Sequence, residues 1–269
     1  MDEVFMPHAI DRRSMLAAAA VGGMALAGTG AGAQSRTAGG GPELYELRTY
    51  RLVGSMKERL DGYLERAFLP AARRAGCGPI GAFTTAIGMG SANVQLLIPH
   101  PSIAAFLELP GKLAADPAYA QAATAYSDAP LASPPYVSLE VKLMRAFGGF
   151  PRIEAPGPGK GRIFELRTYH SHSEKAGATK IGMFDTGGEI DIFRRTGLTP
   201  VFFAQDLTGT HLPSLTYMLT FPDLAAREQS WKAFGADPAW QRLIAMPGLA
   251  ETVTDIDNQI LNPTRYSQI

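Results

Sequence analysis

The chain has 269 residues, and 25 Lys and Arg balance 25 Asp and Glu, so its formal net charge is zero. Apolar residues make up 46% and charged residues 19%, which is typical of globular proteins and excludes disordered, collagen-like and coiled-coil chains. Because a neutral chain lacks the positive field that attracts a phosphate backbone, we expect no nucleic-acid partner. The single cysteine, Cys77, excludes an intrachain disulfide and a zinc site built from several cysteines.

Residues 1–33 have the pattern of an export signal. Arg12 and Arg13 precede an uncharged stretch rich in Ala and Gly, which ends at Ala31-Gly32-Ala33. Such a stretch is typical of a secretory signal peptide, and the paired arginines resemble a twin-arginine (Tat) signal. The alternative is a membrane anchor, which the scarcity of large apolar side chains disfavours. We expect cleavage after Ala33, a periplasmic or exported mature protein and no stable membrane span in it.

The segment 43–147 is predicted to contain a strand, a helix, two strands, a helix and a strand. Apolar spacings of three and four residues predict the first helix from Met56 to Ala71. The second helix is expected to start at Pro101 and to run to Tyr126, with a break at Pro110-Gly111. Alternation and turn residues predict strands at 45–52, 80–87, 93–98 and 136–144.

The segment 162–266 repeats this order. Strands are predicted at 164–170, 201–206, 215–221 and 252–261, and helices at 173–195 and 223–245. The helix at 173–195 contains four glycines, each costing about 1 kcal/mol relative to alanine. We therefore expect either a break near Gly187 or a close approach by another element. The glycines are Gly177, Gly182, Gly187 and Gly188.

Three motifs recur in the same order along the chain. Residues 45–50 return at 164–169 with only the first residue changed, 119 positions later. The Gly-x-x-Pro of 76–79 returns at 197–200, and the Asp-Pro-Ala-Tyr of 116–119 returns as Asp-Pro-Ala-Trp. Near-constant offsets indicate an internal duplication. The Pro- and Gly-rich segment 148–161 between the copies is typical of a linker.

These elements predict an α+β fold. The order β-α-β-β-α-β is that of a ferredoxin-like unit, whose sheet carries helices on one face and needs cover on the other. A second copy supplies that cover. The predicted architecture is two tandem ferredoxin-like units that form a pseudo-dimeric α+β barrel.

Several of these segments carry a family resemblance. They are Glu-Leu-Arg-Thr-Tyr at 46–50 and 165–169, the strand 215–219, Arg227-Glu228, the segment 237–240 and the segment 260–263. The sequence resembles the NIPSNAP family of the dimeric α+β barrel superfamily over residues 43–266. The first copy is degenerate, with Phe106 in the place of Arg227 and Tyr119 in the place of Trp240. The resemblance implies the fold and no single reaction.

Glu165, Arg167 and Tyr169 are predicted to share one face of their strand, because side chains alternate along a strand. A buried Glu–Arg pair needs partners. One interpretation is an ion pair that fixes the strand register between the copies. The other is a polar wall that orients a ligand carboxylate or carbonyl, with arginine as the forked donor.

We place the predicted ligand site in the second copy, between the sheet and its helices, because that copy keeps polar residues that the first has replaced. The competing explanation is packing, with Arg227 on a solvated helix face and Trp240 in the core. The predicted ligand-binding residues are Glu165, Arg167, Tyr169, His172, Arg227 and Trp240.

The remaining candidates are weaker. His170 and His172 have a spacing that suits a metal, with Glu174 nearby, but no distant third ligand is visible, so we expect loop residues and no metal. His100 and His211 lie near prolines and are expected to be solvated. Cys77 is expected to be exposed in a turn, which makes a poor case for catalysis.

Motifs for dinucleotide, phosphate-loop, serine-hydrolase, zinc-protease and dye-decolourising haem peroxidase chemistry are absent from the sequence, so we expect no cofactor. Two functions fit. One is the binding of a small organic molecule in an α+β barrel cavity. The other is a cofactor-independent monooxygenase or isomerase, by analogy with related barrels. The sequence leaves open whether the chain is an enzyme, and it is compatible with a further homo-oligomer.

Overall fold

The computed structural model describes residues 41–88, 93–157 and 161–269. These residues belong to one compact unit. The predicted signal peptide, residues 1–33, lies outside the described residues, and so does the part of the predicted linker at 158–160.

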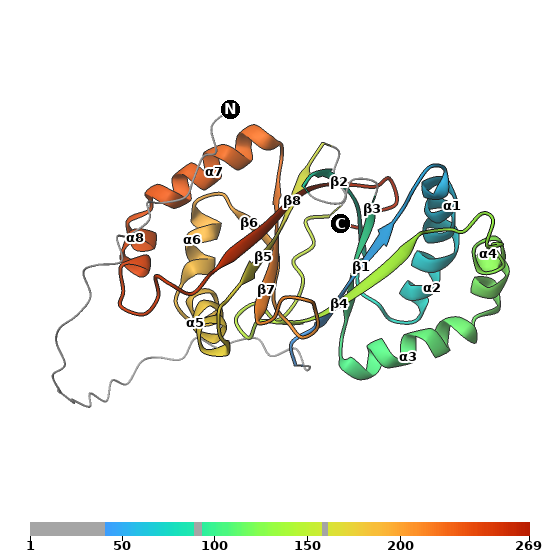
Figure 1. Ribbon diagram of the computed structural model, residues 1–269, viewed down its shortest axis with the longest axis horizontal. Coiled ribbons are helices and arrows are strands. Elements are labelled where there is room, and N and C mark those ends of the chain that lie inside the picture. Colours follow the sequence, from blue (N-terminus) through green and yellow to red (C-terminus); the bar gives the residue numbers. More distant parts are fainter. Residues whose placement is uncertain (1–40, 89–92, 158–160) are drawn as a thin grey trace. The chain divides into compact units, whose positions relative to one another are not determined.

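Eight antiparallel strands close into a barrel (Figure 1), so the fold is of the mixed α+β type. The strand order is β1-β3-β2-β8-β5-β7-β6-β4, and β4 closes the ring by pairing with β1. The N-terminal half, residues 41–147, therefore supplies four adjacent strands, and the C-terminal half, residues 161–269, supplies the other four. The bounds are β1 Leu44–Arg51, β2 Gly81–Ile87, β3 Asn93–His100, β4 Ser138–Ala146, β5 Ile163–His170, β6 Thr199–Asp206, β7 Ser214–Phe221 and β8 Asp255–Pro263. All eight predicted strands are present, with ends shifted by a few residues.

Helices cover the outside of the barrel (Figure 1). Those of the N-terminal half pack on the outer face of its strands around one apolar core, and those of the C-terminal half pack around a second. Their bounds are α1 Met56–Tyr63, a π-helical turn Leu64–Phe68, α2 Leu69–Arg74, α3 Ile103–Ala114, α4 Pro117–Ser127, α5 Glu174–Asp185, α6 Glu189–Arg195, α7 Leu224–Ala236 and α8 Pro238–Ile244. Among the described residues, none of these helices is long and apolar enough to cross a membrane.

A third apolar core fills part of the barrel interior. It contains inward-facing residues from both halves, among them Tyr45, Leu47, Phe164, Leu166 and Phe202. The ring of Tyr45 lies 5.0 Å from that of Phe202, so the two halves interlock there. A cavity lined by Arg48 of β1 and by residues of the helices lies outside the barrel, between strands and helices.

Two helix boundaries differ from the sequence expectation. The second helix of the N-terminal half continues through Pro110 and ends at Ala114, so the predicted break at Pro110-Gly111 is wrong. The chain turns instead at Asp116, whose side chain accepts hydrogen bonds from the first amides of α4. Asp237 starts α8 in the same way. An aspartate at the N-cap followed by proline at the first helical position is a strong signal for the start of a helix. The spacing of apolar residues alone does not locate these two helix starts.

The prediction of a helix break near Gly187 is confirmed. Gly188 has φ +84° and precedes α6, a conformation that favours glycine. A Cβ on Gly187 would lie 2.6 Å from the carbonyl oxygen of Met183, so this position also excludes a side chain. The break redirects the chain between α5 and α6.

Candidate functional site

Glu165 is the centre of a saturated ion-pair cluster in the C-terminal half. It lies on the outer face of β5 and is fully buried. Arg227 of α7 donates from Nε and Nη2 at 2.9 and 2.6 Å, and the Trp231 indole donates at 2.8 Å. Arg167 adds a fourth hydrogen bond at 3.2 Å. All these partners belong to the same half, so the expectation of an ion pair between the copies is wrong.

Arg167 lies beneath aromatic rings. Its guanidinium carbon is 4.6 Å from the Trp231 ring centre and 5.5 Å from that of Tyr169. The Tyr169 hydroxyl is hydrogen-bonded to that of Tyr217 at 2.8 Å. The structure therefore brings four of the six predicted residues, Glu165, Arg167, Tyr169 and Arg227, into one packed cluster.

The other two predicted residues lie apart from Glu165. Trp240 of α8 packs on Phe234, with ring centres 4.4 Å apart. His172 is exposed in the loop between β5 and α5 and contributes none of the hydrogen bonds that hold Glu165. The sequence prediction omitted Trp231, although its position four residues after Arg227 places both on one helix face.

A buried ion pair bridges the break between α5 and α6. Lys180 Nζ lies 3.0 and 2.8 Å from the two carboxylate oxygens of Glu189. Lys180 also lies over the rings of Phe184 and Trp240. Burial raises the pKa of Glu189, against the charge and hydrogen bond of Lys180. The pair joins the two helices beneath the glycine break.

The N-terminal half holds a related cluster with fewer donors. Glu46 of β1 is buried, and it accepts from Arg48 Nε at 2.5 Å and faces His100 Nε2 at 2.9 Å. Burial opposes ionisation of Glu46, but the hydrogen bonds from His100 and Arg48 outweigh it and lower the pKa of the carboxyl. His100 is buried, so the expectation that it is solvated is wrong: it ends β3 and points to Glu46 rather than to water.

A cavity of about 270 Å³ opens over Arg48. The Arg48 side chain is 17% exposed and its guanidinium lies 4.8 Å from the Phe68 ring centre. The hydroxyls of Tyr63 and Tyr119 share a hydrogen bond of 2.9 Å. Burial and this hydrogen bond raise the pKa of Tyr63, so its phenol stays protonated. The lining residues are Arg48, Tyr63, Phe68, Leu109, Pro110, Leu113, Ala114 and Tyr119.

Substitutions at matching positions explain why a cavity lies over Arg48. The helix residues near Arg167 have counterparts 121 positions earlier in the chain. Arg227 corresponds to Phe106, and Trp231 corresponds to Pro110. Pro110 leaves the space that the indole of Trp231 fills in the other half, and Tyr119 matches the larger Trp240. The sequence comparison detected two of these replacements and interpreted them as loss of a site, whereas the half that carries them has a cavity lined by its arginine. The two arginine side chains are equally exposed, Arg48 at 17% and Arg167 at 16%.

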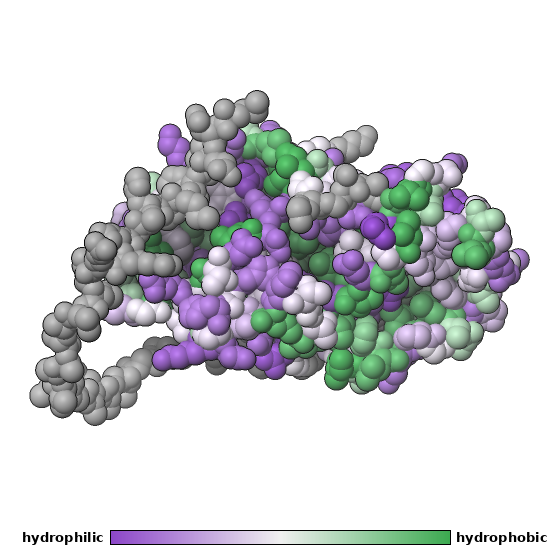
Figure 2. Space-filling view, viewed as in Figure 1, coloured by the Kyte–Doolittle hydropathy of each residue, from purple (hydrophilic) through white to green (hydrophobic). Residues whose placement is uncertain are grey.

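The outer faces of α3 and α7 differ at one of two matching positions. Apolar residues gather over the start of α3 (Figure 2), where Ile103 and Leu107 are exposed. The residue that matches Leu107 in α7 is the exposed Glu228. Ile103 matches Leu224, which is also exposed, so the apolar surface of α3 exceeds that of α7 at Leu107 alone of these two positions.

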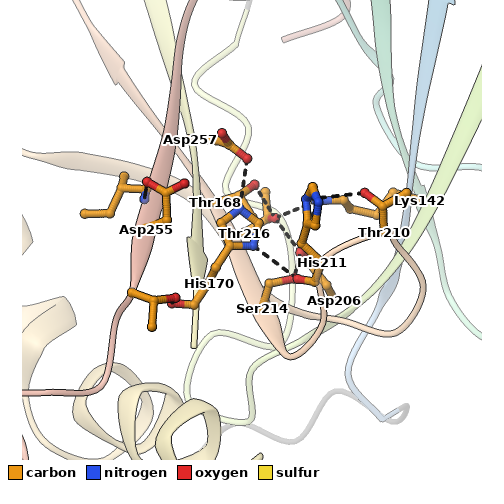
Figure 3. A network of polar contacts seen from close by, with 12 residues as sticks. Lys142, Thr168, His170, Asp206, Thr210, His211, Ser214, Thr216, Asp255 and Asp257 are labelled. Atoms are coloured by element: carbon orange, nitrogen blue, oxygen red, sulfur yellow. Dashed lines mark hydrogen bonds and ion pairs between the residues drawn. The ribbon is translucent and has the colours of Figure 1, made fainter. Parts of the chain in front are cut away.

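One end of the barrel interior is polar (Figure 3). The carboxylate of Asp206 is buried, and its Oδ2 accepts from Ser214 at 2.7 Å, Thr216 at 3.0 Å and Lys142 at 3.1 Å. Oδ1 is buried and has no donor among the described residues. A buried carboxylate oxygen of this kind is suited to an internal water.

The histidines at this end do not form a catalytic triad. His170 Nε2 lies 2.9 Å from Asp257, but its Nδ1 faces the carbonyl oxygen of His211 at 3.1 Å, and Ser214 donates to Asp206. A serine nucleophile needs a hydrogen bond to the histidine base. Within the described ranges, no group of three or more His, Cys, Asp or Glu side chains is arranged to hold a metal ion.

Cys77 is half-buried rather than exposed, contrary to the expectation. Burial raises the pKa of its thiol to about 11. The thiol is therefore a poor nucleophile near neutral pH.

Comparison with protein families identifies the chain's relatives. The NIPSNAP family profile matches residues 45–131 and 164–268, which is more than half of the chain. The chain belongs to the NIPSNAP family. The matches contain both Glu-Leu-Arg-Thr-Tyr strands, the Glu46 and Glu165 clusters and the cavity. A comparison with curated protein sequences gives no significant match.

Solved structures share the fold. A candidate monooxygenase from Lactobacillus acidophilus NCFM is 9% identical, with a TM-score of 0.54 over 82% of this chain and 94% of that chain. A candidate monooxygenase from Fusobacterium nucleatum is 7% identical, with a TM-score of 0.56 over 83% and 93%. A NIPSNAP family protein from Agrobacterium tumefaciens C58 is 23% identical, with a TM-score of 0.36, and the match covers 40% of this chain and 98% of that chain. The first two similarities show that this NIPSNAP chain has the α+β barrel fold of those proteins.

Proposed function

We propose that this NIPSNAP protein binds a small organic molecule in the cavity over Arg48. The observation that carries the proposal is the contrast between two arginines at matching positions. Arg48 lines a cavity of about 270 Å³, while Arg167 lies beneath Trp231. A guanidinium at the base of an apolar pocket is a donor for a ligand oxygen, and it gains strength where water is excluded.

The walls of the cavity define what it suits. Phe68, Leu109 and Leu113 offer apolar surface, and the Tyr63–Tyr119 hydroxyl pair adds polar atoms. A ligand with a flat apolar body and one carboxylate or carbonyl oxygen matches this arrangement. The predicted site at Glu165 is less suitable, because Arg227, Trp231 and Arg167 already satisfy that carboxylate.

The organisation of the barrel supports two tandem ferredoxin-like units that arose by duplication. The strand order within the halves is β4-β1-β3-β2 and β8-β5-β7-β6. Arg74 bonds Asp116 at 2.5 Å, and Arg195 bonds Asp237 at 2.7 Å, each 121 residues later. The NIPSNAP profile matches one segment in each half. In this proposal one unit kept a packed cluster and the other became a binding site.

The test is native mass spectrometry of protein purified from its own host, with Arg48→Met and Arg167→Met compared. We expect a bound small molecule in wild-type protein and in Arg167→Met, and its loss from a folded Arg48→Met. Methionine keeps apolar bulk at both positions and removes the charge. A ligand that stays bound at wild-type occupancy in Arg48→Met contradicts the proposal.

The second candidate function is a cofactor-independent monooxygenase or isomerase. It is supported by the barrel shared with two candidate monooxygenases, and by Arg48, which could stabilise an enolate or phenolate oxygen. The test is oxygen uptake and proton NMR with the compound that mass spectrometry identifies. Turnover that Arg48→Met abolishes supports the enzyme, and an unchanged compound supports a binding protein.

We also propose that the chain is exported. The arginine pair at 12–13 and the Ala-Gly-Ala at 31–33 support this. The N-terminus of the native protein, read by mass spectrometry, is expected at Gln34. A cytoplasmic product that retains Met1 contradicts it.

A further inference from the structure

The cluster beneath the cavity contains three groups whose charges are coupled. The carboxylate of Glu46 lies between Arg48 Nε at 2.5 Å and His100 Nε2 at 2.9 Å. The side chains of Glu46 and His100 are 2% and 0% exposed. With a neutral imidazole the three groups sum to zero charge, and with an imidazolium they sum to one positive charge.

We propose that the ligand of the Arg48 cavity is a single-ring aromatic carboxylate, whose negative charge is balanced by a proton taken up at His100. The inference rests on the proposed function of that cavity and specifies its ligand class. Glu46 accepts a hydrogen bond from Arg48 Nε, and the Tyr50 hydroxyl also lies against the guanidinium. The remaining Nη hydrogens are the donors for a second carboxylate.

A second carboxylate changes the balance of charges. It leaves two negative groups and one guanidinium around a cluster whose Glu46 and His100 side chains are buried. A proton on His100 restores neutrality and strengthens the hydrogen bond to Glu46. The Nδ1 atom of His100 is buried and has no partner among the described residues. An imidazolium would leave its N–H donor unsatisfied there, so protonation is disfavoured in the empty site and needs the charge of the ligand to offset that cost.

In the C-terminal half, a permanently charged arginine bonds the glutamate that corresponds to Glu46. Arg227 gives Glu165 two hydrogen bonds, and the residue that matches His100 is the apolar Phe221. The N-terminal half has no arginine at the matching position, Phe106, and places a titratable histidine on the carboxylate instead. Its second positive charge is therefore conditional on pH and on the ligand.

None of the other described groups around His100 is expected to take up the proton. From β1 the charged neighbours are Glu46 and Arg48, with the Tyr50 hydroxyl near Arg48. From α3 the Phe106 ring lies edge-on at 5.4 Å and is apolar. The Cys77 thiol after α2 is neutral near pH 7, because burial raises its pKa to about 11. Lys112 of α3 acts on that thiol and is paired with the exposed Glu108 at 3.2 Å.

The shape of the cavity selects one ring. Its volume of about 270 Å³ lies just below the roughly 300–1,000 Å³ of pockets for drug-sized ligands. Tyr63 stacks on Tyr126 at 3.6 Å and meets Tyr119 edge-on at 6.3 Å, so these rings pack into one aromatic wall. A flat ring bound against this wall directs its carboxylate to Arg48.

The test is calorimetric titration with benzoate and with its uncharged analogue benzamide between pH 5.5 and 8. Benzoate is ionised over this whole range, so a pH dependence comes from the protein. We expect benzoate to bind about tenfold or more tightly than benzamide at pH 6. Its affinity should fall by about tenfold in total as His100 loses its proton, with the uptake of at most about half a proton at the pH where the uptake is greatest. Buffers of different ionisation enthalpy measure that proton.

Two further measurements assign the proton to His100. In His100→Phe, which installs the residue of the matching position, benzoate affinity should be weaker and independent of pH. In wild-type protein the NMR titration of the His100 ring should shift upward by about one pH unit when benzoate is added, which corresponds to a tenfold coupling. This measurement does not depend on the folding of a variant.

Benzamide binding as tightly as benzoate, or benzoate binding without proton uptake, overturns the inference. So does the failure of both probes to bind. In each case a natural ligand that is lost in Arg48→Met would still support the proposed function, so the two proposals fail separately.

Discussion

Arg48 and Arg167 stand at matching positions of β1 and β5, and each donates a hydrogen bond to the glutamate two residues before it. They differ in what lies above them. The Trp231 ring covers Arg167 at 4.6 Å, while Arg48 lines an open cavity. The same strand motif thus lies in two different surroundings, and the difference originates in the helices that pack on it.

The Glu165 cluster is expected to be a major contributor to stability. Arg227→Met removes two of the four hydrogen bonds to a carboxylate that is fully buried. Removing one partner of a buried ion pair costs several kcal/mol, and Trp231 and Arg167 compensate in part, so we expect a loss of about 3 kcal/mol. Urea unfolding measures it. Glu228→Gln, on the exposed face of the same helix, should change stability by less than about 0.5 kcal/mol. Equal effects of the two variants would contradict this role.

The Lys180–Glu189 pair is expected to hold α5 and α6 together across the glycine break. Lys180→Met leaves the Glu189 carboxylate buried without its partner, which we expect to cost about 3–5 kcal/mol. The double variant Lys180→Met, Glu189→Met should recover most of that loss, because it removes both charges and keeps apolar volume. A double-mutant cycle in urea checks this. Additive losses would show that the two side chains stabilise the fold independently.

Asp237 is expected to make the fold sensitive to acid. Its hydrogen bond with Arg195 lowers the pKa of the carboxyl below the ordinary value of 3.8. In the folded chain the Asp237 carboxyl then stays ionised at a pH where the same carboxyl takes up a proton in the unfolded chain. This contribution is fully present above about pH 4 and is lost as the pH falls below it. Asp237→Asn keeps a helix-capping side chain, so its melting temperature should fall less steeply below pH 4 than that of wild type. Asp128→Asn, at the exposed end of α4, is the control, and its acid profile should follow wild type.

The thiol of Cys77 is expected to react slowly. With its pKa raised to about 11 by burial, alkylation by iodoacetamide at pH 8 should be more than about 100-fold slower than that of an exposed cysteine. The rate should rise about tenfold per pH unit up to pH 10. Because this is the only cysteine, the mass increase of the whole protein reports it. Fast alkylation at pH 8 in native protein, equal to that in urea, would contradict the buried position.

The sequence predicted the order of strands and helices and the faces of the strands. Periodicity was sufficient there, because residues such as Phe164 and Leu166 face the barrel and Glu165 faces the helices. Periodicity could not show that His100, beside a proline, turns inward to Glu46. It also could not show a cavity, since that depends on which side chain occupies the space above Arg48. The replacement of Trp231 by Pro110 was visible in the sequence, but its consequence depends on three-dimensional packing.

Exchanging two residues between the matching helices of the halves is expected to close the cavity. Arg227 and Trp231 lie four residues apart on α7 and both bond Glu165. In α3 the matching positions are Phe106 and Pro110. Replacing both, as Phe106→Arg with Pro110→Trp, should let the new arginine pair with Glu46 and the new indole fill the space over Arg48. Benzoate binding should then be lost, by more than about tenfold in affinity.

Stability separates this result from misfolding. A proline inside a helix costs about 3 kcal/mol relative to alanine, because it removes a hydrogen bond and clashes with the preceding turn. The double variant should therefore unfold at the same or a higher urea concentration than wild type. Pro110→Ala is the matched control: it removes the proline without filling the space, so it should keep wild-type affinity for any probe that the native cavity binds. If the double variant, folded and stable, binds that probe as tightly as wild type, then the missing indole of α3 is not what opens the site.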